Sequence, residues 1–495
     1  MRQVAKNGKA GHVRLRPVGG AALTLLAALL LAGCNSVLMG TSGQPSPSIG
    51  PASAPAVTGE GVEENARIVA AYGGIYHDPK LEQTVARVVG RVVAGSDKPD
   101  LSYRITILNA AAVNAFALPG GYLYVTRGLL ALANDSSEVA AVLAHEMGHI
   151  TANHAIERQN KARDAMIVSR VVTDVLDDNA GKLALASSQR TLAAFSRQQE
   201  LEADAIGVRT ISRAGYDPFA AARFLTAMQH FATYRATLGP GTDKRPDFLA
   251  THPSTPERVQ FAIQAARAAV STGTPEVDRD RYLDGIDGMI WGDDPSQGYV
   301  RGRSFFHPSL GVGFTVPDGF VIDNTADAVL ATGTDGTALR FDAVSLPQGA
   351  DLGAYLASGW VNGLIPGSVK TFTVNGMPAA SANANAKDWT FEIAVVQTDT
   401  GATYRFIFAN ESRSASFDDA AKATVASFRK LAADEVAKLQ PLRVRVVAAA
   451  AGDSEDSFVQ RMRGIDHPRD LFRALNDLAP NAPIAPGTKL KIISD

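Results

Sequence analysis

The segment from residue 135 to 159 constrains the fold most, because it predicts one long, largely apolar helix that carries histidines. It contains no proline, and Asp135 stands where a helix N-cap is expected. On such a helix His145 and His149 are four residues apart and share a face, while Glu146 lies beside them. The two imidazoles can therefore bind one metal ion. The alternative is a surface helix with two solvated histidines.

A catalytic metal site needs more than these two histidines. Their spacing is that of HExxH zinc sites, in which both histidines bind the metal and the glutamate is a general base. A catalytic zinc also needs a third protein ligand and an open position for water. On a later predicted helix, Glu200 and Asp204 are four residues apart in "ELEAD". Glu200 can complete the ligand set, and Asp204 can hydrogen-bond a ligating histidine. A solvated acidic helix face is the alternative.

Four segments, in the same order along the chain, resemble metallopeptidase family forty-eight, a family of HExxH gluzincins to which HtpX, BepA and the CAAX prenyl protease belong. They are "NAFALPGGYLYVTRGLL", "AAVLAHEMGHITANH", "RQQELEADAIGVRTISRAGYDP" and "THPSTPERV". The similarity covers about residues 60–271. The resemblance implies a mainly helical zinc peptidase domain with a small sheet. It implies that His145, His149 and Glu200 bind the zinc ion, that Glu146 is the base and that Asp204 supports a ligand.

Two residues of "HPSTPER" gain a role only from this resemblance. His252 matches a family histidine that can approach the zinc, and Arg258 matches an arginine that points at the active site. Both are suited to stabilising a tetrahedral oxyanion. In some relatives the histidine occupies the open zinc position and keeps the enzyme latent. By residue type alone, His252 is a solvated loop histidine. His154 is expected to be structural or exposed.

The segment "NAFALPGG" resembles the family's edge strand beside the active-site cleft. Asn114, Ala115, Phe116 and Ala117 are the residues along which an extended substrate can add as another strand. Recognition through the backbone predicts a broad sequence preference and a need for unfolded substrate. The reaction implied is peptide-bond hydrolysis assisted by one zinc ion, in which Glu146 takes a proton from water and delivers it to the leaving amine.

The first 33 residues predict a bacterial lipoprotein signal peptide. They contain five Lys or Arg and no acid, and their apolar run "AALTLLAALLLA" is shorter than a membrane-spanning helix. "LAGC" resembles a lipobox, in which Cys34 is lipidated; an ordinary buried thiol is the alternative. Because Cys34 is the only cysteine, no disulfide can form within the chain. Residues 34–58 are rich in Ser, Pro, Gly and Ala and predict a flexible tether.

The whole chain predicts an α+β multidomain protein. A peptidase domain is expected over residues 59–282, an α+β module of unknown role over 300–437 and a small module over 441–495. Within the first, helices are predicted at 60–76, 78–94, 164–176, 183–213 and 218–238, with a further one ending near 271. The last module predicts strand, helix, helix, strand and resembles a divergent LysM module. Such modules bind peptidoglycan glycans, and a structural spacer is the alternative.

Charge excludes one class of partner. Without the first 33 residues, the 48 Lys and Arg fall to 43 against 50 Asp and Glu, which is unfavourable for nucleic acid binding. We expect a lipid-anchored, periplasm-facing zinc metalloendopeptidase that acts on misfolded or unassembled envelope proteins. Asn35 after the lipidated cysteine favours the outer membrane over the inner membrane. Two alternatives are a non-hydrolytic envelope assembly or chaperone protein, and a peptidoglycan-binding lipoprotein with a vestigial peptidase.

Overall fold

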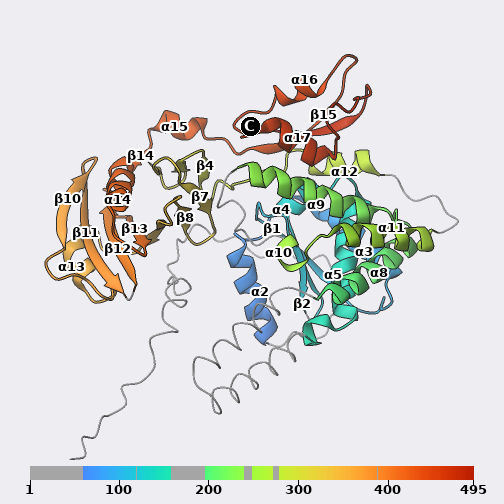
Figure 1. Cartoon of the computed structure of the whole chain (residues 1–495), viewed down its shortest axis with the longest axis horizontal. Helices are drawn as coiled ribbons and strands as arrows, with labels where there is room; N and C mark the ends of the chain where they lie inside the picture. Colours follow the sequence, from blue (N-terminus) through green and yellow to red (C-terminus); the bar gives the residue numbers. More distant parts are fainter. Residues whose placement is uncertain (1–58, 119, 158–195, 239–247, 271–277, 387) are drawn as a thin grey trace, which may run out of the picture. The chain divides into compact units, whose positions relative to one another are not determined.

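The computed structural model describes residues 59–118, 120–157, 196–238, 248–270, 278–386 and 388–495 (Figure 1). The predicted signal peptide, the lipobox with Cys34, the tether and the helix expected at 164–176 lie outside them. The described part contains helices and several sheets, in agreement with the α+β prediction. No helix within these ranges is both long and apolar enough to span a bilayer.

A three-stranded sheet lies next to the helix that carries the HExxH sequence. It is built from β1 (Arg104–Leu108), β2 (Ala115–Leu118) and β3 (Tyr122–Thr126), in the order β1-β3-β2. β1 runs parallel to β3, while β2 pairs antiparallel with β3 so that Ala115 opposes Val125. β2 is therefore an edge strand, and it also contacts α5 (Ser136–Thr151).

Helix α5 starts where the sequence predicts, because the Asp135 side chain accepts a hydrogen bond from the Glu138 amide. Every residue from Ser136 to His149 is buried, so the surface-helix alternative for the two histidines is wrong. The helix ends at Thr151, and the predicted extension to residue 159 was too long. Asn153 adopts a φ of 60°, a left-handed conformation that asparagine tolerates and that interrupts a helix.

Helix α8 (Arg197–Arg213) packs closely against α5. Ser196 caps α8 together with Gln199, so the helix predicted over 183–213 does not run through Ser196. An added Cβ at Gly207 would lie 3.2 Å from the backbone nitrogen of His145, and one at Gly148 would lie 3.2 Å from the carbonyl oxygen of Ala203. The two glycines thus allow an approach that a side chain would prevent, and this approach brings the histidines of α5 near the acids of α8.

Further helices complete this domain, which is drawn from blue to yellow-green in Figure 1. They are α2 (Gly59–Ala71), α3 (Pro79–Gly95), α4 (Arg127–Leu132), α9 (Ala220–Thr237), α10 (Phe248–Thr251), α11 (Pro256–Ala269) and α12 (Arg279–Ile286). The sequence predicted α2, α3, α9 and α11 to within a few residues. It missed α4, α10 and α12, of which α4 and α10 are too short to show a helical period.

The following module contains two sheets. One has the order β14-β6-β5-β4, and the other is an antiparallel sheet with the order β10-β11-β12-β13-β9-β8-β7. The strands are β4 (Tyr299–Arg301), β5 (Ser304–His307), β6 (Val312–Thr315), β7 (Val321–Asn324), β8 (Val329–Thr332), β9 (Ala338–Val344), β10 (Lys370–Val374), β11 (Met377–Ala386), β12 (Trp389–Gln397), β13 (Thr403–Asn410) and β14 (Arg429–Lys430). Helices α13 (Leu352–Ala357) and α14 (Ala415–Ser427) accompany them. The strand spacing of five aromatic residues, Phe314, Phe320, Phe341, Trp389 and Phe408, predicts that they form the core of this module. Phe314, Phe341 and Phe408 are buried in its core and Phe320 packs against it, whereas Trp389 is half-buried and outside these clusters.

The C-terminal segment has the predicted order of strand, helix, helix, strand. After α15 (Ala433–Lys438), it comprises β15 (Arg443–Ala448), α16 (Glu455–Val459), α17 (Pro468–Asn476) and β16 (Lys489–Ser494). Its apolar side chains, including Phe458 and Phe472, join the same core as the peptidase helices. Lys491 is fully buried and donates to the carbonyls of Ala131, Leu132 and Ala133 at the end of α4. The expectation of a separate small module therefore needs correction, because the two segments share one core.

Candidate metal centre

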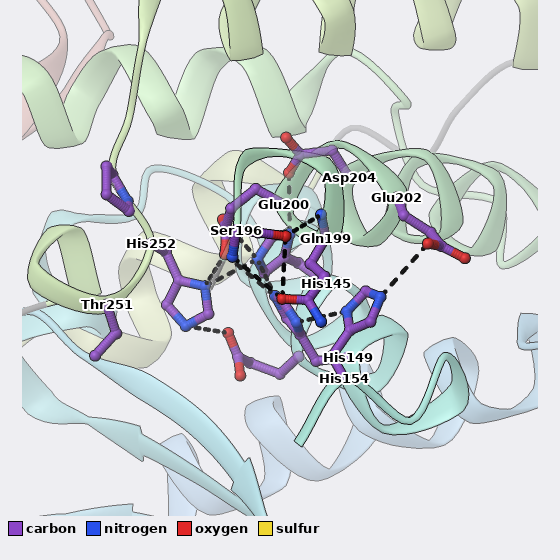
Figure 2. Close-up of polar contacts among 12 residues, drawn as sticks. His145, His149, His154, Ser196, Gln199, Glu200, Glu202, Asp204, Thr251 and His252 are labelled. Carbon is purple, nitrogen blue, oxygen red and sulfur yellow. Dashed lines mark hydrogen bonds and ion pairs between the residues drawn. The ribbon is translucent and has the colours of Figure 1, made fainter. Parts of the chain in front are cut away.

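Two helices, and the turn that follows a third helix, bring four potential metal ligands together. His145 and His149 come from α5, Glu200 from α8, and His252 directly follows α10. All four side chains are buried, and each offers one nitrogen or oxygen within 4.8 Å of the others. Figure 2 shows the three imidazoles gathered around Glu200. The structure thus joins the histidine pair to the predicted third ligand and adds His252.

The distances between these atoms suit a tetrahedral ion. The Nε2 atoms of His145 and His149 lie 3.0 Å apart, and His145 Nε2 lies 3.3 Å from His252 Nδ1. Glu200 oxygens lie 2.9 Å from His252 Nδ1, 3.5 Å from His149 Nε2 and 3.6 Å from His145 Nε2. Ligands about 2.0–2.1 Å from a tetrahedral zinc ion would be roughly 3.3 Å from one another. The donor set and its spacing therefore fit zinc.

Asp204 and Arg258 hold the ligands in place. The Asp204 Oδ1 atom lies 2.9 Å from His145 Nδ1, which directs the Nε2 atom of that ring into the cluster. Arg258 donates to both Asp204 oxygens at 2.8 Å, and its Nη1 atom lies 2.7 Å from a Glu200 oxygen. The same nitrogen donates to the backbone carbonyls of His252 and Pro253. Arg258 thus connects α11 with α8 and with the turn that carries His252.

His154 takes a position that the sequence did not indicate. Its ring is 1% exposed, and its Nδ1 atom lies 2.9 Å from His149 Nδ1, while its Nε2 atom lies 3.5 Å from Glu202 (Figure 2). Residues five apart on a continuous helix would point about 140° away from each other. The break at Asn153 is what allows His154 to reach His149. His154 thus orients the second histidine, as Asp204 orients the first.

Burial controls the charges in the cluster. It lowers the pKa of His145 and of His149, and their charged neighbours do not reverse this, so both rings are neutral as metal binding requires. Burial by itself would raise the pKa of Asp204, but hydrogen bonds from Arg258 and His145 lower that pKa to about 2. Asp204 is therefore a carboxylate that can hold the proton of His145 on the nitrogen facing away from the cluster.

Glu146 lies beside the cluster and does not join it. One of its oxygens is 3.5 Å from His252 Nε2, and the backbone amide of Ala117 on β2 hydrogen-bonds its carboxyl group. Burial, followed by the nearby charge of Glu200, raises the pKa of Glu146 well above its ordinary value. A carboxyl group with a raised pKa, placed next to a metal site, is suited to proton transfer.

The predicted edge strand also borders the cluster. Asn114 precedes β2, and its carbonyl accepts from the Thr126 amide of β3. Because carbonyls alternate in direction along a strand, those of Val113, Ala115 and Ala117 face the open side of the sheet. The contact between Ala117 and Glu146 places this open side next to the metal ligands.

Comparison with known proteins agrees with this geometry. The family model described as Peptidase family M48 matches residues 79–266, which include the four candidate ligands, Glu146 and Arg258. This part of the chain is therefore similar to peptidase family M48.

Several proteins are similar to the M48 segment. The beta-barrel assembly-enhancing proteases of Yersinia pestis and Escherichia coli K12 are each 29% identical over 202 residues, which is 39% of this chain and 40% of theirs. The mitochondrial metalloendopeptidase OMA1 of Schizosaccharomyces pombe is 32% identical over 185 residues, which is 37% of this chain and 52% of that protein. The chain therefore matches less than two thirds of the length of each of these relatives.

Proposed function

We propose that this protein is a zinc metalloendopeptidase of the bacterial cell envelope that cleaves misfolded or unassembled envelope proteins. One observation carries the proposal: four buried donor atoms converge at tetrahedral spacing, with the Glu146 carboxyl group beside them. The names of the relatives, which are proteases linked to barrel assembly or to mitochondria, support hydrolysis and an envelope location.

His145, His149 and Glu200 would hold the zinc ion. When bound, zinc would supply Lewis acidity that polarises a peptide carbonyl and makes a nearby water more acidic. Asp204 and His154 keep the ligating rings in the orientation that exposes Nε2. Because both rings are neutral before any metal arrives, binding does not have to displace a proton from the nitrogens that face the ion.

Glu146 carries the proton. Its carboxylate takes a proton from the attacking water and then donates it to the nitrogen of the leaving amine. The Ala117 amide orients the carboxyl group, and the surrounding side chains exclude bulk water, leaving Glu146 only 3% exposed. A raised pKa makes the protonated form a realistic donor in the second step.

His252 keeps the enzyme latent in this proposal. Its Nδ1 atom stands within 3.3 Å of His145 Nε2 and 2.9 Å of Glu200, in the place that a water or a peptide carbonyl would need. Its Nε2 atom also lies against Glu146. Substrate can therefore reach both the metal and the base only after His252 has moved.

Arg258 is assigned a different role from the one its sequence context implied. We expected it to stabilise the oxyanion, yet its guanidinium is 3% exposed and bonds to Asp204, Glu200 and two carbonyls. We propose that Arg258 positions the ligands and neutralises their acids, while His252 remains a candidate oxyanion donor after it has left the metal.

The edge of β2 would bind substrate as an added strand. Ala115 is 1% exposed and lies between Val113, whose carbonyl accepts from the Phe248 amide, and Ala117, whose amide hydrogen-bonds Glu146. A substrate strand would therefore pair with this edge after Phe248 has moved. Side chains play a small part in strand addition, so we expect broad specificity and a requirement for unfolded substrate.

Lipidation of Cys34 would attach the protein to the periplasmic face of the outer membrane. Peptidoglycan binding by residues 441–495 is a secondary proposal that follows from the strand, helix, helix, strand order of this segment.

The test compares purified full-length protein with two variants on an unfolded model protein. Glu146→Gln should lower cleavage by a factor of about 10²–10⁴, since the proton carrier is lost. His252→Ala should raise cleavage because the fourth position is vacated. His230→Ala is the control, as that histidine lies at the surface with an exposed side chain. Addition of a chelator should abolish all activity, and zinc should restore it.

Each outcome separates the parts of the proposal. Cleavage that resists both Glu146→Gln and the chelator would exclude metal-dependent hydrolysis. Absence of cleavage by every form of the protein would favour the non-hydrolytic envelope assembly or chaperone alternative. A lower rate of hydrolysis in His252→Ala than in the wild type would leave the peptidase proposal intact and refute latency.

A further inference from the structure

The short helix α10 brings a second group to the metal centre besides His252. Phe248 is 2% exposed, and its ring stacks on the His252 imidazole with centroids 4.4 Å apart and an interplanar angle of 19°. It also lies 5.9 Å from the ring of His145. No step of the proposed reaction uses this phenyl ring, although it forms part of the wall of the site.

Phe248 is buried beside a small apolar void next to the candidate ligands. The pocket is lined by Val113, Met228, Phe231, Ala232, Phe248 and Leu249, and it contains no charged or polar side chain. About 10 Å³ is left beside the ring, which is roughly the space of one water molecule. Phe248 is itself one wall of this small void, so displacement of its ring would open a larger apolar pocket between the remaining walls.

The backbone amide of Phe248 also takes a hydrogen-bond acceptor at the edge of the sheet, where a substrate strand would pair. Its amide donates to the Val113 carbonyl at 2.8 Å. The next carbonyl, that of Asn114, accepts from β3, so the Val113 carbonyl faces the open edge of the sheet. An extended peptide that paired with this edge would need the same acceptor.

We propose that residues 248–252 are an internal substrate mimic, and that the pocket filled by Phe248 selects a bulky apolar side chain of the substrate beside the cleaved bond. The inference rests on the proposed peptidase function. Three positions are occupied by one segment: the Phe248 amide takes the edge acceptor, its ring takes the side-chain pocket, and His252 takes the fourth ligand position.

The two side chains leave their sites together. The His252 amide donates to the Phe248 carbonyl at 2.8 Å, so the two residues lie one helical turn apart on a rigid unit. A substrate side chain that enters the pocket displaces Phe248 and thereby withdraws His252 from the metal. Apolar residues such as Phe, Leu and Met, which unfolding exposes, fit the apolar walls, and the flexible Met228 can adapt to them.

The first measurement needs no variant. Full-length protein with zinc is incubated with an unfolded protein, and the cleavage sites are mapped by mass spectrometry. We expect Phe, Leu, Met or Tyr to be enriched at one fixed position relative to the cleaved bond. A profile without any apolar preference overturns the inference but leaves the peptidase proposal intact. Absence of metal-dependent cleavage overturns both.

Variants then test the Phe248 side chain and the pocket wall at Ala232. Phe248→Ala should raise kcat/KM at least fivefold, and Phe248→Leu should have an intermediate effect while keeping the pocket filled. His230→Ala is the control, since His230 lies on α9 outside this segment and its side chain is exposed. Ala232→Leu narrows the pocket. Two peptides that differ only in having Phe or Ala at the selected position are then compared, and the ratio of their kcat/KM values, Phe over Ala, should fall about tenfold in this variant.

A short peptide provides an independent readout. A synthetic peptide with the sequence of residues 248–252, "FLATH", should inhibit the His252→Ala variant competitively, and the version with Ala in place of Phe should inhibit at least tenfold less. Equal inhibition by both peptides, or equal kcat/KM in Phe248→Ala and His230→Ala, would contradict the assignment.

Discussion

Replacement of Arg258 by alanine should destabilise the protein far more than the loss of another arginine that joins the same two helices. Arg258 on α11 pairs with Asp204 and Glu200 of α8 inside the protein, with side chains no more than 6% exposed. Arg197 on α8 pairs with Glu257 of α11 at the surface, where the two side chains are 72% and 47% exposed. The two ion pairs differ mainly in burial, which makes Arg197→Ala a matched control.

The magnitude follows from the groups left behind. Without Arg258, two buried carboxyl groups and the carbonyls of His252 and Pro253 lose a donor. Removal of one partner from a buried ion pair costs about 3–5 kcal/mol in unfolding free energy. For a cooperative unit of 150–250 residues this corresponds to a fall in melting temperature of about 6–20 °C. Arg197→Ala should show no measurable change, because water already solvates both of its charges.

The assay is thermal unfolding followed by circular dichroism, in a chelator so that metal binding does not contribute. We expect Arg258→Ala to melt well below the wild type and Arg197→Ala to melt with it. If the two variants melt within 2 °C of each other, the guanidinium does not hold α8 and α11 together, and the positioning role would be wrong.

Three other changes test features remote from the reacting atoms. Lys491→Met should cost about 2–4 kcal/mol of unfolding free energy, because three carbonyls of α4 lose their donor, while Lys489→Met on the same strand should have little effect in urea denaturation. His154→Ala should weaken zinc binding about 10–100-fold in a competition titration, with His230→Ala unchanged; equal affinities would show that His154 does not support its neighbouring ligand. Burial, then the charge of Asp135, raises the pKa of Glu138 to about 7, above its unfolded value of 4.5. Stability from this group is complete below pH 4.5 and is lost as the pH rises through 7, so Glu138→Gln should gain melting temperature relative to wild type between pH 5 and 8. A difference that stays constant with pH would contradict this.

Local structure was predictable wherever one short segment contains the whole signal. Asp135 caps α5 as its position before an apolar, proline-free run predicts. The sequence does not predict β11, because "MPAASANANA" has low strand propensity. Its alanines Ala380, Ala382 and Ala384 are buried in a small cluster with Leu356 of α13, and it is this packing that favours the strand.

The sequence by itself determined the pair of histidines with Glu146, because the period of a helix places residues four apart on one face regardless of what surrounds them. It also indicated Glu200 and Asp204 through the same spacing, and family resemblance pointed to His252 and Arg258. Only the tertiary structure decided how these groups meet. The glycine contacts between α5 and α8 set the distance between ligands, and the break at Asn153 turned His154 onto His149. Contacts between residues distant in sequence depend on the packing of whole elements, and no local pattern encodes that packing.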